Sequence, residues 1–91
     1  MDWDNVSSVA FVTNFTPTKN GLLIANGKTT NTNGIIAITM PNKPFGNHYI
    51  AMACYPNTNV EIGCSALVNK GQTYYISYYA VNGTGYFIPF K

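Results

Sequence analysis

Turn signals recur along this chain about every ten residues, and they restrict its fold more than any other feature. Asn-Gly favours tight hairpin turns because both residues accept positive φ, and it occurs at 20–21, 26–27, 33–34 and 82–83. Lys70-Gly71 and Phe45-Gly46 add two further turn signals. The runs between these signals are rich in Val, Ile, Thr, Tyr and Phe, which are typical of strands. The pattern predicts an all-β chain.

The strands are expected to be short and antiparallel. Pro41, Pro44 and Pro56 are expected to end the strands that precede them, and the turn at 82–85 to join the last two strands. No stretch shows the 3.6-residue apolar period of a helix. We predict a small antiparallel β-sandwich or jelly roll of about seven or eight strands, at 6–15, 22–26, 35–40, 48–55, 59–62, 65–68, 72–81 and 85–90.

Length and composition indicate one folded domain. The 91 residues fit a single domain at 6–91, which we expect to follow a flexible segment at 1–5. Charged residues make up only 9% of the chain, against about 25% in an ordinary soluble domain. The five lysines are scattered and there is no arginine, so nucleic acid is not an expected partner. No apolar run reaches the roughly 20 residues of a membrane span, so membrane insertion is not expected.

The residue inventory argues against catalysis. The chain has one histidine, His48, and three carboxylates, Asp2, Asp4 and Glu61, and their spacing pairs none of them. His48 and Cys54 are about 20 Å apart if they share a strand. We therefore predict no enzyme activity, no catalytic residue, no metal site and no cofactor.

Two cysteines, Cys54 and Cys64, have a spacing that allows a bridge between neighbouring strands. Free Cys is also common as a small buried apolar residue, and small secreted domains held by disulfides usually carry four or more cysteines. Free thiols are the favoured interpretation, and the redox state stays open.

The strand expected at 72–81 carries tyrosines on both faces, whereas a strand with one wet face alternates apolar and polar residues. One face fills the sandwich, and the other must meet a second subunit or a ligand. The chain has seven Tyr, five Phe and one Trp, more than a sandwich of this size can bury. Each aromatic packed at an interface contributes about 1.5–3 kcal/mol. We expect self-association in a closed oligomer through Tyr75, Tyr78, Tyr79 and Phe87.

The polar residues suit sugar recognition. Amides and hydroxyls pair with sugar hydroxyls, and tyrosine rings stack on sugar faces. The segments 41–47 and 55–59 have this composition, and so has 29–33. The expected ligand-binding residues are Asn47, Tyr55, Asn57 and Asn59. The alternative interpretation is that these Asn and Thr residues serve only as turn and strand-edge residues.

Two stretches, "TPTKNGLLIANG" and "CSALVNKGQTYYISYYAVNGTGYFIPFK", carry a family resemblance. Over residues 17–91 the chain resembles the small C-terminal β-sandwich of bacteriophage tail-fibre and receptor-binding tip proteins. The matching motifs are Asn-Gly before an aliphatic strand at 20–24, Val-x-Lys-Gly at 68–71 and Phe-Ile-Pro at 87–89. The layout is also similar to the trimeric jelly rolls of the tumour necrosis factor and complement type.

The resemblance implies a homotrimer at the tip of a virion tail fibre that adheres to a glycan or protein of the bacterial surface. It supplies no fixed binding-site motif, and it leaves open whether the chain is an excised tip or a complete small protein. Two alternatives stay open: a structural trimerisation module without a ligand, and a small bacterial surface lectin or adhesin subunit that works as a monomer or dimer. A hydrolase is a third alternative, which the residue inventory disfavours.

Overall fold

A computed structural model describes residues 1–43 and 46–91 of the chain, and the side chains of 42–48 lie outside the description. In these residues one 3-10 turn, η1 (Trp3–Asn5), precedes eight strands. The strands are β1 (Ser7–Val9), β2 (Asn14–Phe15), β3 (Gly21–Thr29), β4 (Gly34–Lys43), β5 (Gly46–Tyr55), β6 (Glu61–Val68), β7 (Tyr74–Tyr79) and β8 (Val81–Pro89). The predicted all-β class is confirmed, and the predicted turn at Phe45-Gly46 lies outside the described residues.

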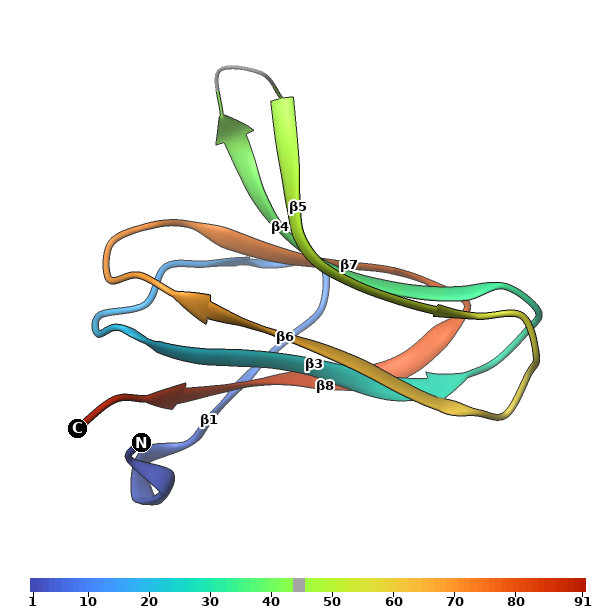
Figure 1. The fold of residues 1–91 in the computed structure, drawn as a ribbon, viewed down its shortest axis with the longest axis horizontal. Helices are drawn as coiled ribbons and strands as arrows, with labels where there is room; N and C mark the ends of the chain where they lie inside the picture. Colours follow the sequence, from blue (N-terminus) through green and yellow to red (C-terminus); the bar gives the residue numbers. More distant parts are fainter. Residues whose placement is uncertain (44–45) are drawn as a thin grey trace.

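The strands form two four-stranded sheets that pack on each other (Figure 1). Sheet A has the order β1-β8-β3-β6, and sheet B has the order β2-β7-β4-β5. Neighbouring strands are antiparallel, and β1 pairs with β8, β2 with β7, β3 with β6 and β4 with β5. The first strand therefore pairs with the last, the second with the seventh, and so on to the central pair. The chain has the topology of one long β-hairpin whose two arms are folded into two sheets. This arrangement is the predicted sandwich in its jelly-roll form.

The core lies between the sheets and is filled by alternate residues of the long strands. Leu23 and Ala25 of β3, and Ile36 and Ile38 of β4, are all fully buried. Because successive strand residues point to opposite faces, the residues next to these in sequence point outward. The sequence fixes the core by alternation, and alternation also determines which residues lie on the two outer faces.

The predicted single strand at 6–15 is wrong in one respect, because the structure divides it between the sheets. β1 pairs with β8 in sheet A, and β2 pairs with β7 in sheet B. The chain crosses between them at residues 10–13, where Val12 has φ 60° and its N–H donates to the Ile76 carbonyl at 2.8 Å. An alternating apolar run does not reveal such a crossing, since both halves bury the same face.

Three of the four predicted Asn-Gly turns are also wrong. Gly21 begins β3, and neither Asn20 nor Gly21 has a positive φ. Gly27 and Gly83 lie directly opposite each other inside the paired strands β3 and β8. A Cβ on Gly27 would lie 2.7 Å from the Asn82 carbonyl oxygen, so glycine is needed here for close backbone approach. The turn between the last two strands lies instead at Ala80, which has φ 54°.

Other turn signals act as predicted. Asn33 has φ 59° between β3 and β4, and Gly71 has φ 82° between β6 and β7. Pro41, however, does not end its strand, because β4 continues to Lys43. The β4–β5 register shifts between Met40 and Lys43, and an irregular pairing of this kind tolerates a residue without an N–H.

The two termini lie close together at one end of the sandwich (Figure 1). The Asp2 N–H donates to the Pro89 carbonyl at 2.7 Å, so the start of the chain is fastened to the end of β8. The part of β4 and β5 next to residues 44–45 extends beyond the other strands of sheet B (Figure 1).

Candidate functional site

The outer face of sheet B carries aromatic residues of β5 and β7 on either side of β4. We call this surface the tyrosine face and define it by Ile35, Ala37, Tyr49, Met52, Cys54, Tyr75, Ser77 and Tyr79. In the β4 register, Ile35 lies between Cys54 and Tyr79, and Ala37 lies between Met52 and Ser77. Tyr49 and Tyr79 are 63% and 61% exposed, so their rings are available to a partner.

A β-bulge in β5 brings two of these side chains to the same face. Ile38 pairs with Ala51 but Thr39 pairs with Tyr49, which leaves Ile50 without an opposite residue. Tyr49 and Met52 are three residues apart, so an unbroken strand would place them on opposite faces. The extra residue restores both to the outer face. Sequence reasoning missed them because alternation alone cannot locate a bulge.

Two adjoining hollows mark the tyrosine face. One has a volume of about 210 Å³ and is lined by Ile35, Ala37, Tyr49, Met52, Ser77, Tyr78 and Tyr79. The other has a volume of about 320 Å³ and is lined by Asn33, Ile35, Cys54, Tyr55 and Pro56. Ile35 borders both. Ala37 is small and only 1% exposed, so it forms a floor between larger neighbours.

The sequence-predicted ligand residues do not all come together. Tyr55 ends β5 and borders the tyrosine face, and the exposed residues Asn57 and Asn59 follow it in the β5–β6 loop. Asn47 stands near the other end of β5, about 26 Å away along the strand. Its side chain lies outside the described residues, so Tyr55 is the one predicted residue that borders a described hollow of this face.

Thr29 holds the β5–β6 loop in place. This residue is 2% exposed, and its hydroxyl donates to the Asn57 carbonyl and accepts from the Val60 N–H, both at 2.8 Å. The Asn59 N–H donates to the Thr29 carbonyl at 2.8 Å, and Asn59 itself has φ 64°. Asn59 therefore has the turn role that was the alternative interpretation, because Asn tolerates positive φ.

The residues expected at an oligomer interface are also separated. Tyr75 and Tyr79 point outward from β7 as the alternation predicts, and both belong to the tyrosine face. Tyr78 points to the other side of the sheet, where its ring packs on Phe11 with centroids 5.4 Å apart. Phe87 is only 6% exposed and packs in the core, 5.2 Å from the Phe15 ring. Its strand places it inward because Tyr86 and Ile88 occupy the outer face of β8.

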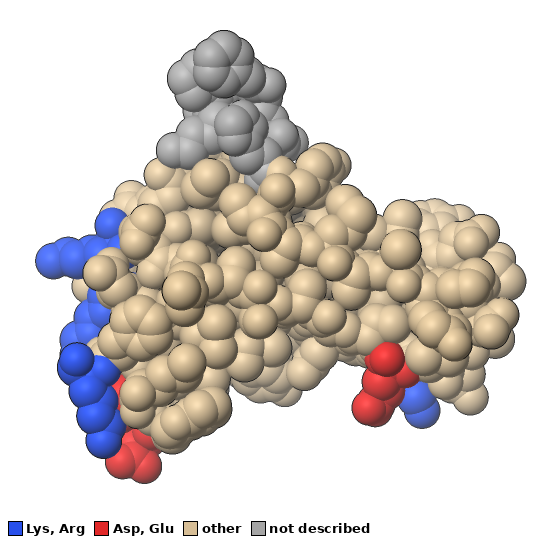
Figure 2. All heavy atoms as spheres, viewed as in Figure 1, with Lys and Arg blue, Asp and Glu red and all other residues tan. Residues whose placement is uncertain are grey.

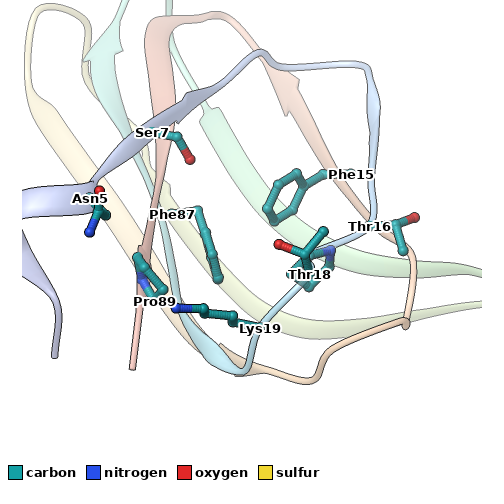
Figure 3. A pocket seen from close by; sticks show the side chains of 9 residues that line it. Asn5, Ser7, Phe15, Thr16, Thr18, Lys19, Phe87 and Pro89 are labelled. Atoms are coloured by element: carbon teal, nitrogen blue, oxygen red, sulfur yellow. The ribbon is translucent and has the colours of Figure 1, made fainter. Parts of the chain in front are cut away.

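A separate hollow opens between the sheets, where β1 and β2 are too short to close the sandwich (Figure 3). Its volume is about 310 Å³, and its lining mixes apolar rings with polar groups. The lining residues are Asn5, Ser7, Phe15, Thr16, Pro17, Thr18, Lys19, Phe87 and Pro89. Aromatic rings below hydroxyls and an amide suit a small amphipathic molecule.

Catalytic groups are not assembled among the described residues. No cluster of three or more His, Cys, Asp or Glu that could hold a metal ion occurs there. Asp2 lies beside η1, where it accepts a hydrogen bond from the Asn5 amide at 2.7 Å, and Glu61 lies opposite Lys28 at the far end of sheet A. The side chain of His48 is outside the description. None of the helical structure in the described parts of the chain has the length and apolarity needed to cross a bilayer.

Both cysteines are free thiols in the structure, as the sequence favoured. Cys54 is exposed on the tyrosine face, in register with Ile35. Cys64 points toward the core from β6, and its thiol lies 3.9 Å from the Ile36 carbonyl. Burial raises the pKa of the Cys64 thiol above its ordinary value.

Comparison of this chain with protein-family models, curated proteins and solved structures finds no match.

Proposed function

We propose that the chain is a non-enzymatic receptor-binding domain, the homotrimeric tip of a bacteriophage or phage-derived tail fibre, that adheres to a glycan of the bacterial surface. The observation that supports this function best is the tyrosine face, with its two adjoining hollows. Rings exposed beside the Ser77 hydroxyl and the Asn33 amide combine a stacking surface with hydrogen-bonding groups. The motif resemblance at 17–91 supports the placement on a fibre tip.

The scarcity of charge supports a sugar rather than an ionic partner. On the side of the molecule seen in Figure 2, charged side chains lie only at the periphery and leave an uncharged surface between them. An uncharged, amide- and hydroxyl-bearing surface binds neutral ligands without the cost of removing water from ions. Its binding is also insensitive to salt, because there is little charge to screen.

The direct test replaces exposed rings of the tyrosine face. Tyr79→Ser and Tyr49→Ser are expected to lower binding to a glycan array and to whole bacteria by about tenfold or more each, as the loss of one aromatic contact implies. Because both rings are mostly exposed, the free energy of unfolding should change by no more than about 0.5 kcal/mol.

Thr18→Ala is the matched control, because Thr18 lines the hollow between β1 and β2 and lies outside the tyrosine face. It should leave binding unchanged. Loss of binding in this variant alone would move the receptor site to that hollow. A trimer that binds neither glycans nor cells would be a structural trimerisation module, and a binding-competent monomer of 10.0 kDa would be a small lectin or adhesin subunit.

A further inference from the structure

The outer face of sheet A carries a second apolar surface, which differs in chemistry from the tyrosine face. We call it the aliphatic face and define it by Val6, Leu22, Ile24, Leu67 and Tyr86, of which Val6, Leu67 and Tyr86 are exposed and Leu22 and Ile24 half-buried. Leu67, Leu22 and Ile88 are cross-strand partners across β6, β3 and β8, but Ile88 is only 2% exposed, so the open part of this row lies at Leu67 and Leu22. Val6 comes immediately before Ser7, which pairs with Phe87, so it extends the row beside Ile88.

The row next to it is mixed in polarity. Ser65, Ile24, Tyr86 and Ser8 lie side by side across all four strands of sheet A. Gly63, Asn26 and Thr84 follow, and the last row joins Glu61, Lys28 and Asn82. The face is therefore aliphatic near the chain termini, polar in the middle and charged only at its far end.

Exposed aliphatic side chains need a partner more than exposed tyrosines do. Leu67 is 70% exposed on an edge strand and has no polar atom, so only an apolar cover can remove its surface from water. A tyrosine can keep its hydroxyl hydrated while its ring packs. Long edge strands such as β6 also present unpaired backbone groups, which natural proteins usually cover.

The charges of this face suit a second copy of the same chain. Only Lys28 and Glu61 are charged on it, and they lie directly opposite each other on β3 and β6. These two opposite charges lie side by side within one chain, so the sheet face carries no net charge that would repel a second copy. The rest of the face contains no charge that a copy would repel.

The outer face of sheet A is of the same order of size as an oligomer contact, although smaller in projection. Four strands spaced at about 4.8 Å, with eight residues at about 3.3 Å each, give a sheet of about 19 by 26 Å, or roughly 500 Å² in projection. Side-chain relief and the β6 edge increase the accessible area beyond this figure. Specific interfaces bury about 800 Å² per partner.

From these observations we infer that the aliphatic face is the contact between copies, with three chains packing their sheets A around a three-fold axis. This inference rests on the proposed homotrimer and specifies its geometry. Because the two outer faces lie on opposite sides of the sandwich, the same packing turns the tyrosine face away from the axis toward a receptor.

The test uses Leu67→Lys with Met52→Lys as its matched control. Both residues are exposed on edge strands, of sheet A and sheet B respectively. Light scattering should give about three times 10.0 kDa for the unchanged protein and for Met52→Lys, and about 10.0 kDa for Leu67→Lys. Circular dichroism should show the same strand content in all three.

The possible results separate the inference from the proposed function. A trimer that survives Leu67→Lys but dissociates on Met52→Lys or Tyr79→Ser overturns the inference and keeps the homotrimer, with its contact on the tyrosine face. An unchanged protein of 10.0 kDa overturns the homotrimer itself, and the inference with it. If Leu67→Lys does not fold, the milder Tyr86→Ser, which removes a ring that is 38% exposed on the same face, should lower the mass in dilute solution. A mass unchanged by Tyr86→Ser at all concentrations would contradict the inference.

Discussion

The two outer faces of this sandwich arise from the same alternation of residues but carry different side chains. Sheet A presents leucine, isoleucine and valine in register across its strands, whereas sheet B presents tyrosine and methionine around two hollows. A flat aliphatic surface gains most from permanent cover by another chain. A hollowed tyrosine surface stays compatible with water until a ligand arrives. The comparison shows that the type of apolar residue, as much as the amount, indicates what an exposed face is for.

The largest expected effect comes from Gly83→Ala, which breaks sheet A. A Cβ here would collide with the carbonyl oxygen of Asn26 on β3, and backbone cannot move aside as a flexible side chain can. We expect the free energy of unfolding to fall by about 3 kcal/mol, measured by urea titration. Ser65→Ala, on the outer face of the same sheet, should stay within about 0.5 kcal/mol. Equal stability of the two variants would show that the strands do not approach closely at the glycines.

A smaller effect is expected from Thr29→Val, which loosens the loop that borders the tyrosine face. The substitution keeps the shape but removes the hydroxyl that bonds Asn57 and Val60. The free energy of unfolding should fall by about 2 kcal/mol, because a buried N–H and a carbonyl lose their partner. Amide hydrogen exchange should increase at 57–60 and stay the same in β8. Unchanged exchange at 57–60 would mean that the hydroxyl does not hold the loop.

The two thiols should differ in reactivity, because Cys54 lies on the outer face of sheet B and Cys64 points toward the core from sheet A. A bulky maleimide should modify the exposed Cys54 readily and the half-buried Cys64 slowly. Labelled protein should keep its mass as an oligomer and lose receptor binding, since Cys54 lines a hollow of the tyrosine face. Preferential labelling of Cys64, read by peptide mass spectrometry, would contradict the assignment of its side chain to the interior.

The smallest expected effect is an alkaline loss of stability caused by Cys64. Burial raises the pKa of its thiol in the folded state, so the unfolded state releases the proton at lower pH. The stabilisation is complete below the ordinary thiol pKa of about 8.5 and is lost as the pH rises through the folded-state pKa. Cys64→Ala should flatten this alkaline decline in urea titrations, and Cys54→Ala should not. The same decline in both variants would assign it to other groups.

Most of the fold was predictable because burial repeats every second residue. The alternation at 74–79 placed Tyr75, Ser77 and Tyr79 on one face, and the structure confirms it. The inward position of Phe87 was not predicted, because alternation separates it from Tyr86 and Ile88 without showing which set faces the core, and only its pairing with Leu23 decides this. The candidate site was only partly predictable, since Tyr55 borders a hollow while Tyr49 and Met52 reach the same face only through the bulge at Ile50.

The amino-acid sequence by itself determined the all-β class, the approximate strands and the scarcity of charge on the surface. It did so because these properties depend on local composition and on a two-residue period. Only the tertiary structure decided which Asn-Gly pairs form turns and which lie inside strands. Gly27 and Gly83 lie inside β3 and β8 because these two strands pair with each other there. Pairing between distant strands also decided the bulge in β5 and the division of 6–15 between two sheets. Contacts between residues far apart in the chain leave no periodic signal in the sequence.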